Sequence, residues 1–308
     1  MSQQRIWLTG SRGFIGRSLV QNLRNAQVDL TCLTQDAGIQ AGVAGETFPV
    51  YVNYLDITDI EKKVSSLGMP DVFIHLGWGD MRNPDSPLHL NDNVKMARNF
   101  IETLFRLGLK KFIFIGSMNQ YGSRTGLLSE DMEAQGPLTN YAKAKNEVER
   151  LGLQAAARFG KIFISVRVFY VLGADQRRGS LINDLFIARR KGESISLSPC
   201  AFYRDYIHLL DLVEGLRRIC AVEQSTIINL GSGNAVRMKD FVSAFWQVMG
   251  GDVDQLKFGV RTLLPGEIEQ PKSYADLKRL IGLTGWQPRL SLEDGIIKTI
   301  ESLSKESI

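Results

Sequence analysis

Tyr141 and Lys145 are four residues apart in the segment YAKAK. On a helix this spacing places both side chains on one face. A nearby ammonium and an oxidised nicotinamide would both stabilise a phenolate, so the tyrosine could exchange a proton with a substrate hydroxyl while hydride moves to or from the cofactor. Ser117 follows an apolar run 24 residues earlier, and its hydroxyl could hold the substrate oxygen beside the phenol. We predict that these three residues are catalytic.

The Tyr–Lys spacing is a weak signal by itself. The chain has 8 tyrosines, so about half of one such pair is expected by chance at average lysine content. A second pair, Tyr274 and Lys278, is predicted to lie on a surface helix. Context separates the two pairs, because Ser117 ends an apolar strand-like segment and doubly wound folds bind ligands at the carboxyl ends of their strands.

A glycine-rich segment, TGSRGFIG, lies between the first apolar run and the first amphipathic run. Gly10 permits a tight turn, Gly13 lets the backbone approach a pyrophosphate, and Gly16 allows close helix–strand packing. The N-terminus of the following helix would offer N–H groups to the phosphates. We therefore predict a dinucleotide site whose residues are Gly10, Arg12, Gly13, Phe14, Ile15, Gly16, Thr34, Asp56, Ile57, Leu76, Gly77, Tyr141 and Lys145.

The second predicted strand bears on the choice between the two nicotinamide cofactors. A free ribose 2′-OH usually meets an acidic residue about 20 residues after the glycine turn. Thr34 occupies that position here, and Asp36 comes two residues later. With Arg12 in the glycine loop, this pattern favours NADP(H), and NAD(H) remains possible. Asp56 could accept a hydrogen bond from the adenine amino group, or cap a helix that begins at Thr58.

The elements that must position these residues alternate along the first two thirds of the chain. Apolar runs without alternation predict strands buried on both faces, hence a parallel sheet covered by helices. The fold class is therefore α/β, a doubly wound parallel (Rossmann) sheet with a smaller mixed α/β C-terminal lobe. The predicted strands are 5–9, 28–33, 48–54, 71–76, 111–116, 161–168 and 226–230, and the predicted helices are 14–25, 58–67, 88–108, 139–159, 180–191 and 209–221.

This pattern also predicts how the chain divides. Residues 1–170 plus 201–230 are assigned to the NAD(P)-binding domain, and residues 171–200 plus 231–308 to the substrate-binding lobe. The polar loop from Trp78 to Pro87 follows a strand and could border the substrate cleft. Of the three histidines, His75 and His208 are interpreted as structural. His89 is interpreted as lying in a polar loop and carries no signal.

Composition excludes several classes of protein. The 308 residues contain 37 Lys+Arg and 33 Asp+Glu, a net charge of +4, with both signs mixed along the chain. A nucleic-acid partner would call for charge concentrated on one face, so none is predicted. The three cysteines show no metal-ligand spacing, so no metal is predicted. The sequence shows no long apolar segment, which predicts a cytoplasmic protein without a membrane partner.

As a set, these motifs resemble the extended short-chain dehydrogenases/reductases, in the branch that acts on nucleotide sugars. TGSRGFIG, GSMNQYG, YAKAK, RVFYVLG, RDYIHLLD and NLGSG occur in that family's order, and the similarity runs from about residue 5 to 296. The resemblance implies a nucleoside diphosphate sugar in a cleft between two lobes and a homodimer paired through the helices at 88–108 and 139–159. It also implies the substrate-binding residues Ser117, Asn119, Tyr141, Tyr170 and Arg204.

Arg204 matches a family arginine on the diphosphate of the sugar nucleotide, and a guanidinium suits phosphate oxygens in any case. The alternative is an ion pair with Asp205 or Asp211. Tyr170 replaces an asparagine of the family pattern, so contacts with the sugar cannot be carried over. Leu264 replaces a basic residue, for which Arg261 could substitute.

Departures from the family pattern reduce the number of reactions that the chain is expected to catalyse. Dehydratases have an Asp-Glu pair where this chain has Met118 and Asn119, which argues against loss of water. Arg12 with Thr34 favours NADPH-dependent reduction of a 4-keto-(6-deoxy)hexose of a nucleoside diphosphate sugar, with Tyr141 as acid/base. The alternatives are an NAD-dependent C4 epimerase and, in another class, a non-catalytic dinucleotide-binding regulator.

Overall fold

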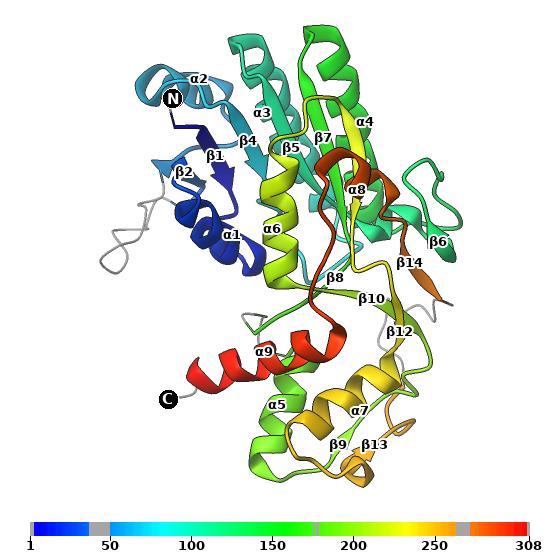
Figure 1. The fold of residues 1–308 in the computed structure, drawn as a ribbon. Coiled ribbons are helices and arrows are strands. Elements are labelled where there is room, and N and C mark those ends of the chain that lie inside the picture. Colours follow the sequence, from blue (N-terminus) through cyan, green and yellow to red (C-terminus); the bar gives the residue numbers. More distant parts are fainter. Residues whose placement is uncertain (1–2, 37–49, 175, 177–178, 263–271, 307–308) are drawn as a thin grey trace.

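Seven parallel strands form the main sheet, in the order β11-β7-β5-β4-β1-β2-β3 (Figure 1). The computed structural model describes residues 3–36, 50–174, 176, 179–262 and 272–306. The order runs outward in both directions from the neighbours β1 and β4, so the switch point of a doubly wound sheet lies between them. The strands are β1 (Arg5–Thr9), β2 (Asp29–Thr34), β3 (Val50–Tyr51), β4 (Val72–His75), β5 (Lys111–Ser117), β7 (Ile162–Val168) and β11 (Thr226–Leu230).

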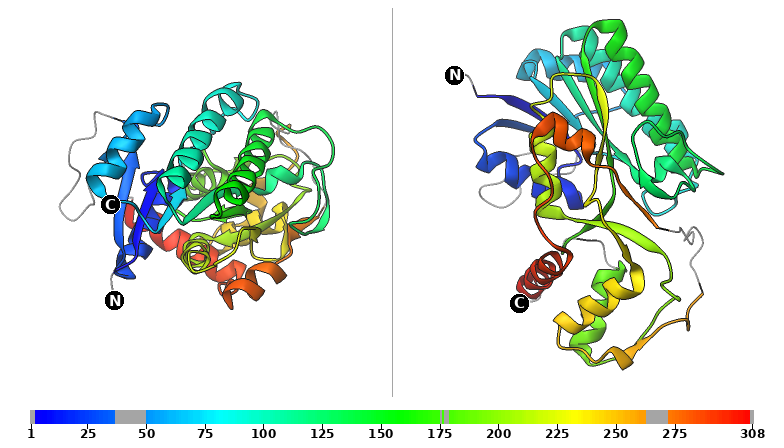
Figure 2. Two further views of the ribbon diagram at one scale, coloured as in Figure 1. Left: turned by 90° about the horizontal axis from the view of Figure 1, so that it is seen from above. Right: turned by 45° about the vertical axis from the view of Figure 1, so that its right-hand side comes forward.

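Helices cover both faces of this sheet, which confirms the predicted fold class (Figure 2). One face packs against α1 (Phe14–Asn25) and α6 (Leu209–Ile219). The other packs against α2 (Ile57–Leu67), α3 (Val94–Leu107) and α4 (Asn140–Phe159). Burial on both sides is the reason that the strand sequences show no apolar–polar alternation.

Aromatic side chains fill the layer between the sheet and the helices α3 and α4. The rings of Phe73 and Phe112 stack with centroids 5.0 Å apart, and those of Phe112 and Phe163 with centroids 5.7 Å apart. Burying each such side chain contributes about 1.5–3 kcal/mol to folding. This packing fixes β4 and β5, whose carboxyl ends carry the predicted site residues.

The segments predicted at 88–108 and 48–54 differ in detail from the structure. His89–Asn93 form a π-helical turn, η1, and the regular helix α3 begins only at Val94. Of the strand predicted at 48–54, residues 50–51 form β3, and residues 48–49 lie outside the described residues. The π turn has a consequence for the site, because it directs His89 inward.

A second cluster of elements lies at the carboxyl end of the sheet (Figure 1). Its core contains Leu185, Phe241, Phe245, Trp246 and Ile296. The elements are β8 (Tyr170–Leu172), α5 (Leu181–Lys191), β9 (Ile195–Ser196), β10 (Tyr203–His208), β12 (Ala235–Arg237), α7 (Met238–Val248), η3 (Val253–Gln255), β13 (Leu256–Lys257) and α9 (Leu292–Glu306).

The chain returns to the large sheet before its last helix. β14 (Ser273–Ala275) pairs with β6 (Gly126–Leu128), and α8 (Lys278–Thr284) packs near α6. Leu280 and Trp286 belong to the core of the large sheet. The domain boundary predicted at residue 231 stays a proposal. In the structure, the returning segment that contains β14 and α8 packs on the side of the large sheet.

The second Tyr–Lys pair is therefore not on one helix. Tyr274 lies in β14 and Lys278 is the first residue of α8, so the predicted surface helix is wrong here. The helical pattern at 278–284 is real, but β-pairing with Gly126–Leu128 takes the tyrosine into an extended segment. Only Tyr141 and Lys145 share a helix face.

The described residues include no helix long and apolar enough to cross a membrane. They also include no cluster of three or more His, Cys, Asp or Glu side chains that could hold a metal ion. Cys32, Cys200 and Cys220 are all buried, and none of the three forms a disulfide.

Candidate active site

The glycine turn lies between β1 and α1 at the switch point of the sheet. Gly10 has φ +75°, and a Cβ there would lie 2.7 Å from the backbone nitrogen of Gly77. A Cβ on Gly16 would fall on the carbonyl oxygen of Gly10. Gly13 is the N-cap of α1 and provides no side-chain cap, so the first N–H groups of the helix remain available to an anion. This cradle fits the pyrophosphate of a dinucleotide.

A buried hydrogen-bond chain holds the opposite wall of this cradle in place. The N–H of Gly77 donates to Thr9 Oγ1 over 3.1 Å, and that hydroxyl lies 2.8 Å from His75 Nδ1. Burial, with a smaller effect from the Lys145 charge, lowers the pKa of His75 to about 3. The imidazole is therefore neutral and held by its buried hydrogen bond with Thr9, which agrees with the structural role predicted for His75.

A carboxylate lies beside Arg12, at the end of the site that is predicted to meet the ribose of the cofactor. Arg12 Nη1 lies 3.7 Å from Asp36 Oδ2, and both side chains are well exposed. Thr34 ends β2, and its hydroxyl accepts from the Asp36 N–H over 3.2 Å. Asp36 had no predicted role, since it lies two residues beyond the usual acidic position. Its carboxylate thus lies beside a residue that is predicted to bind the cofactor.

Asp56 serves as the N-cap of α2, the second of its two sequence interpretations. Its carboxylate accepts from the Thr58 N–H over 2.9 Å. Ile57 is the first residue of α2 and is exposed. Contact of either residue with adenine stays a prediction.

The three predicted catalytic residues come together at the carboxyl end of β5. Ser117 ends β5, and Tyr141 and Lys145 lie in the first two turns of α4, which begins at its cap Thr139. Burial raises the pKa of Tyr141, and a hydrogen bond with Ser117 acts in the opposite direction. Lys145 donates to the carbonyl of Ile115 over 2.7 Å, and burial lowers its pKa well below the usual value.

A buried polar network, which was not predicted from the sequence, fixes the backbone of Ser117. Gln120 Oε1 accepts from the Ser117 N–H over 2.9 Å, while its amide nitrogen donates to Asn146 and Glu149 over 3.0 and 3.1 Å. Glu149 also forms a 2.6 Å ion pair with Arg167. The one signal in the sequence was the spacing of Glu149. It lies four residues after Lys145, which places an acidic side chain on the same buried face of α4.

We expect Gln120→Leu to lower the free energy of unfolding by about 1–3 kcal/mol, because it takes the acceptor from the Ser117 N–H and the Gln120 donor from Asn146 Oδ1. Turnover should fall as well, since Ser117 loses its backbone restraint. Urea unfolding followed by circular dichroism measures the first effect. Gln154→Leu is the matched control, because Gln154 is exposed and accepts a hydrogen bond from the exposed Arg150, and its effect should stay within about 0.5 kcal/mol. Equal losses in both variants would contradict the role of Gln120.

One cleft of about 1140 Å³ joins these parts between the sheet and the smaller cluster of elements. Its volume suits a large ligand or two ligands, compared with about 300–1,000 Å³ for ordinary pockets. The predicted residues in its wall are Gly10, Gly13, Phe14, Ile15, Gly16, Leu76, Gly77, Ser117, Asn119, Tyr141, Lys145 and Tyr170. Arg12, Thr34, Asp56, Ile57 and Arg204 are outside this wall.

Arg204 is buried between two aromatic rings that do line the cleft. Its guanidinium carbon lies 4.5 Å from the ring centroid of Tyr170 and 4.3 Å from that of Phe202. The alternative ion pairs are not formed, because Asp205 and Asp211 accept backbone N–H groups instead. Tyr170, the departure from the family pattern, thus packs on the arginine that the resemblance assigns to phosphate.

The loop from Trp78 to Pro87 borders the cleft, as predicted, through Trp78, Met81, Arg82 and Pro84. His89, which carried no signal in the sequence, is fully buried behind this loop. The interpretation of a histidine in a polar loop was therefore wrong, because the π turn at 89–93 rotates the ring inward. Arg261 also lines the cleft, whereas Leu264 lies outside the described residues.

His208 has the structural role predicted for it. Its Nδ1 accepts from the Leu210 N–H over 3.2 Å and caps α6. Burial lowers its pKa to about 4, against a smaller opposing effect of Asp211. An imidazole that is neutral and already bonded to the backbone does not act as a base in the cleft.

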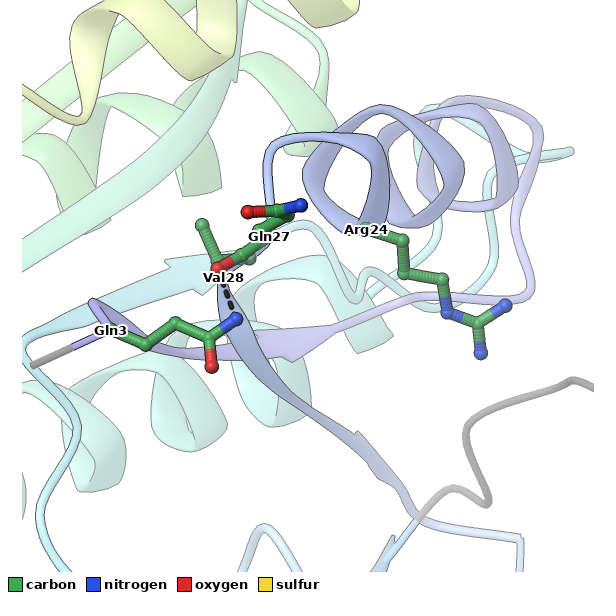
Figure 3. Close-up of a pocket in the computed structure, with 4 residues that line it drawn as sticks. All are labelled: Gln3, Arg24, Gln27 and Val28. Atoms are coloured by element: carbon green, nitrogen blue, oxygen red, sulfur yellow. Dashed lines mark hydrogen bonds between the residues drawn. The ribbon is translucent and has the colours of Figure 1, made fainter.

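A second hollow lies at the opposite end of the sheet, beside the amino ends of β1 and β2. Gln3, Arg24, Gln27 and Val28 line it, and the amide of Gln3 donates to the Gln27 carbonyl (Figure 3). Its lining provides no nucleophile and no acid–base pair. The predicted catalytic residues lie instead at the carboxyl ends of the strands.

A glycine cradle at the switch point, with a serine and a Tyr–Lys pair beside it, defines a nicotinamide-dependent oxidoreductase of the short-chain type. The chain belongs to the NAD-dependent epimerase/dehydratase family, whose model matches residues 6–231.

Relatives of this chain are named for different reactions. The chain is 26% identical to dTDP-4-dehydro-6-deoxyglucose reductase of Escherichia coli, covering 97% of each chain. It is 26% identical to UDP-glucose 4-epimerase of Streptomyces lividans, covering 81% of this chain and 82% of that one. The solved structure of MoeE5 in complex with UDP-glucuronic acid and NAD superimposes with a TM-score of 0.84 at 25% identity, over 99% of this chain and 100% of that one.

Proposed function

We propose that this chain is a nucleotide-sugar oxidoreductase that reduces a 4-keto-(6-deoxy)hexose of a nucleoside diphosphate sugar with NADPH. The observation that carries the chemistry is that Tyr141, Ser117 and Lys145 line the same cleft as the glycine turn. The reductase of Escherichia coli, which matches over nearly its whole length, supports the choice of reaction.

In this mechanism, the glycine turn would hold a reduced nicotinamide cofactor, which would supply the hydride for the C4 carbon. The hydroxyl of Ser117 holds the C4 oxygen, and the phenol of Tyr141 donates its proton to that oxygen as the carbon–oxygen double bond is reduced. The ammonium of Lys145 stabilises the phenolate that remains, and water returns the proton. Burial of Tyr141, which raises its pKa, keeps the phenol protonated before the transfer.

Arg204 is the residue proposed to hold the diphosphate of the substrate. Its guanidinium donates one hydrogen bond within the described residues, to the Tyr203 carbonyl over 3.2 Å. The flat faces of the group are packed against Tyr170 and Phe202, so its N–H edge is the part suited to phosphate oxygens. Asn119 and Tyr170 are proposed to contact the sugar nucleotide from the cleft wall.

A C4 epimerase is the second candidate. The similarity to UDP-glucose 4-epimerase favours it, and so does Asp36, whose carboxylate could accept from a free ribose hydroxyl and would repel a 2′-phosphate. A non-catalytic regulator is disfavoured, because both Tyr141 and Lys145 are present and line the cleft.

The cofactor preference tests the choice between these reactions. We expect the purified protein to arrive without cofactor and to bind NADPH more tightly than NADH, as measured by absorbance and by calorimetry. Arg12→Leu should weaken NADPH binding about tenfold, because a charged hydrogen bond to the 2′-phosphate is lost. Asp36→Asn should strengthen it a few-fold, since an exposed charge effect is small.

Binding of NADH provides the control, because it lacks the 2′-phosphate and should respond little to Arg12→Leu. Protein that is purified with tightly held NAD would contradict the proposed cofactor and would make the epimerase the leading candidate. Reduction of a panel of 4-keto sugar nucleotides, beginning with dTDP-4-dehydro-6-deoxyglucose, then identifies the substrate.

The homodimer, the cytoplasmic location and the absence of nucleic-acid and membrane partners stay predictions. The outward surface of α3 and α4 bears on the first of these. It carries the ion pairs Arg98–Glu147 and Arg158–Glu102, at 3.9 and 3.8 Å. A dimer that forms through these helices would have charged pairs in its interface.

A further inference from the structure

The ammonium of Lys145 is surrounded by aromatic rings rather than by acids. Lys145 is only 4% exposed, and no carboxylate forms an ion pair with it in the part of the chain that the structure describes. Its Nζ lies 3.6 Å from the ring centroid of Trp78 and 4.7 Å from that of Phe114. The carbonyl of Ile115 accepts one of its protons over 2.7 Å. Aromatic faces attract cations at these distances.

A buried hydrogen-bond chain fixes the indole of Trp78. His89 Nε2 lies 2.9 Å from the carbonyl of Asn83, so it bears the proton of the imidazole. His89 Nδ1 is then an acceptor, and both Trp78 Nε1, at 3.1 Å, and Asn93 Nδ2, at 3.2 Å, donate to it. Asn93 also exchanges two hydrogen bonds with the backbone of Gly79. The loop after β4 is thus tied to η1 through one neutral histidine.

The same two rings contact the proposed acid of the reaction. Trp78 and Tyr141 meet edge to face, with centroids 6.2 Å apart, and His89 and Tyr141 lie 5.4 Å apart. The backbone N–H of Tyr141 donates to the carbonyl of Pro84 in the same loop, over 2.8 Å. The position of the indole is therefore coupled to both residues of the Tyr–Lys pair.

We propose that Trp78 is a positioning residue for the acid–base pair, because its indole face keeps the Lys145 side chain charged and beside Tyr141. The indole is held by His89 and occupies the place that a carboxylate partner of the lysine would otherwise take. This inference rests on the proposed function, in which Lys145 stabilises the phenolate of Tyr141. A cation–π contact attracts the ammonium without offering an acceptor that would compete with the phenolate for its protons.

The other ionisable groups around Lys145 do not provide this stabilisation. His75, on β4, is neutral because burial lowers its pKa to about 3. Glu149, one turn further along α4, is bonded to Arg167. His89 has both ring nitrogens in hydrogen bonds, and Tyr141 is the partner in the reaction. Removal of the indole should therefore lower the pKa of Lys145 further and, through the lost charge, raise that of Tyr141.

The test follows Lys145 directly in the full chain. Lysine is labelled with ¹³C at Cε, and the Lys145 signal is assigned by its absence in Lys145→Met. We expect the titration midpoint of this signal to fall by about one pH unit in Trp78→Leu. It should fall less in Trp78→Phe, which keeps an aromatic face. His89→Phe removes the acceptor of the indole N–H and should give an intermediate shift.

Trp246→Phe is the matched control. Trp246 is fully buried, whereas Trp78 is partly buried. The indole N–H of Trp246 also donates, to the Asp252 carbonyl over 2.9 Å, but it lies in the smaller cluster, away from Lys145. An unchanged midpoint in both Trp78 variants would overturn the proposal, and so would an equal shift in Trp246→Phe. Trp78→Phe retains a ring in the core, so the comparison remains available if Trp78→Leu does not fold.

Turnover provides a second measurement with a defined direction. In Trp78→Leu, the phenol of Tyr141 should stay protonated to higher pH, so the alkaline limb of the reduction rate with dTDP-4-dehydro-6-deoxyglucose should move upward. A protein that reduces no 4-keto sugar nucleotide would contradict the proposed function, while the Lys145 titration would still decide the role of Trp78.

Discussion

Tyr141→Phe is expected to lower kcat for hydride transfer about a thousandfold, because the phenol is the only proposed group that gives its proton to the substrate oxygen. The ring remains, so its contacts with Trp78 and His89 are retained. Cofactor binding should therefore persist while chemistry is lost. Single-turnover absorbance at the reduced-nicotinamide band measures the rate, and calorimetry measures binding.

The second Tyr–Lys pair supplies the matched control for this change. Tyr274→Phe alters a tyrosine four residues before a lysine, but on β14, so its rate should equal that of the unaltered chain. A Tyr141→Phe protein with unchanged turnover would show that the proton comes from elsewhere, and the proposed mechanism would be wrong.

Gly16→Ala is expected to weaken cofactor binding about ten- to a hundredfold. Its Cβ would fall on the carbonyl oxygen of Gly10, so the turn that cradles the pyrophosphate must shift. Overpacking of this kind typically costs about 1–3 kcal/mol, and one tenfold change in affinity corresponds to about 1.4 kcal/mol. Calorimetric titration with NADPH and NADH measures the loss for both cofactors.

Gly282→Ala is the control for this prediction. Gly282 lies in α8, and a Cβ there would meet no atom within 4 Å among the described residues. Alanine is the better helix former, so this variant should bind cofactor normally and unfold at the same or a slightly higher temperature. Normal cofactor binding by Gly16→Ala would mean that the dinucleotide does not lie on this turn.

Local patterns in the sequence predicted the frame of the molecule. The unalternated runs before Thr9 and Ser117 predicted parallel strands, and the spacing of Gly10, Gly13 and Gly16 predicted a turn that a dinucleotide can approach. Such features are encoded within one strand, turn or helix, so a single segment is enough to read them. The place of Ser117 beside Tyr141 followed because parallel strands bring their carboxyl ends to one edge.

Contacts between distant segments escaped this approach. Asp36 received no role until the structure placed it beside Arg12. His89 was interpreted as a residue of a polar loop, and the polar partners of Gln120 could not be known before α4 was packed on the sheet. No repeat or spacing in the sequence marks such pairs, because they depend on where separate elements converge.

The sequence by itself thus determined the doubly wound fold, the glycine cradle and the Ser–Tyr–Lys set, since each depends on local periodicity or on a rule of parallel sheets. The tertiary structure alone decided what surrounds those groups: the indole over Lys145, the aromatic rings on Arg204 and the carboxylate beside Arg12. The physical reason is that burial, charge pairing and ring contacts are set by distances in space between residues far apart in the chain, and those distances exist only once the core has packed.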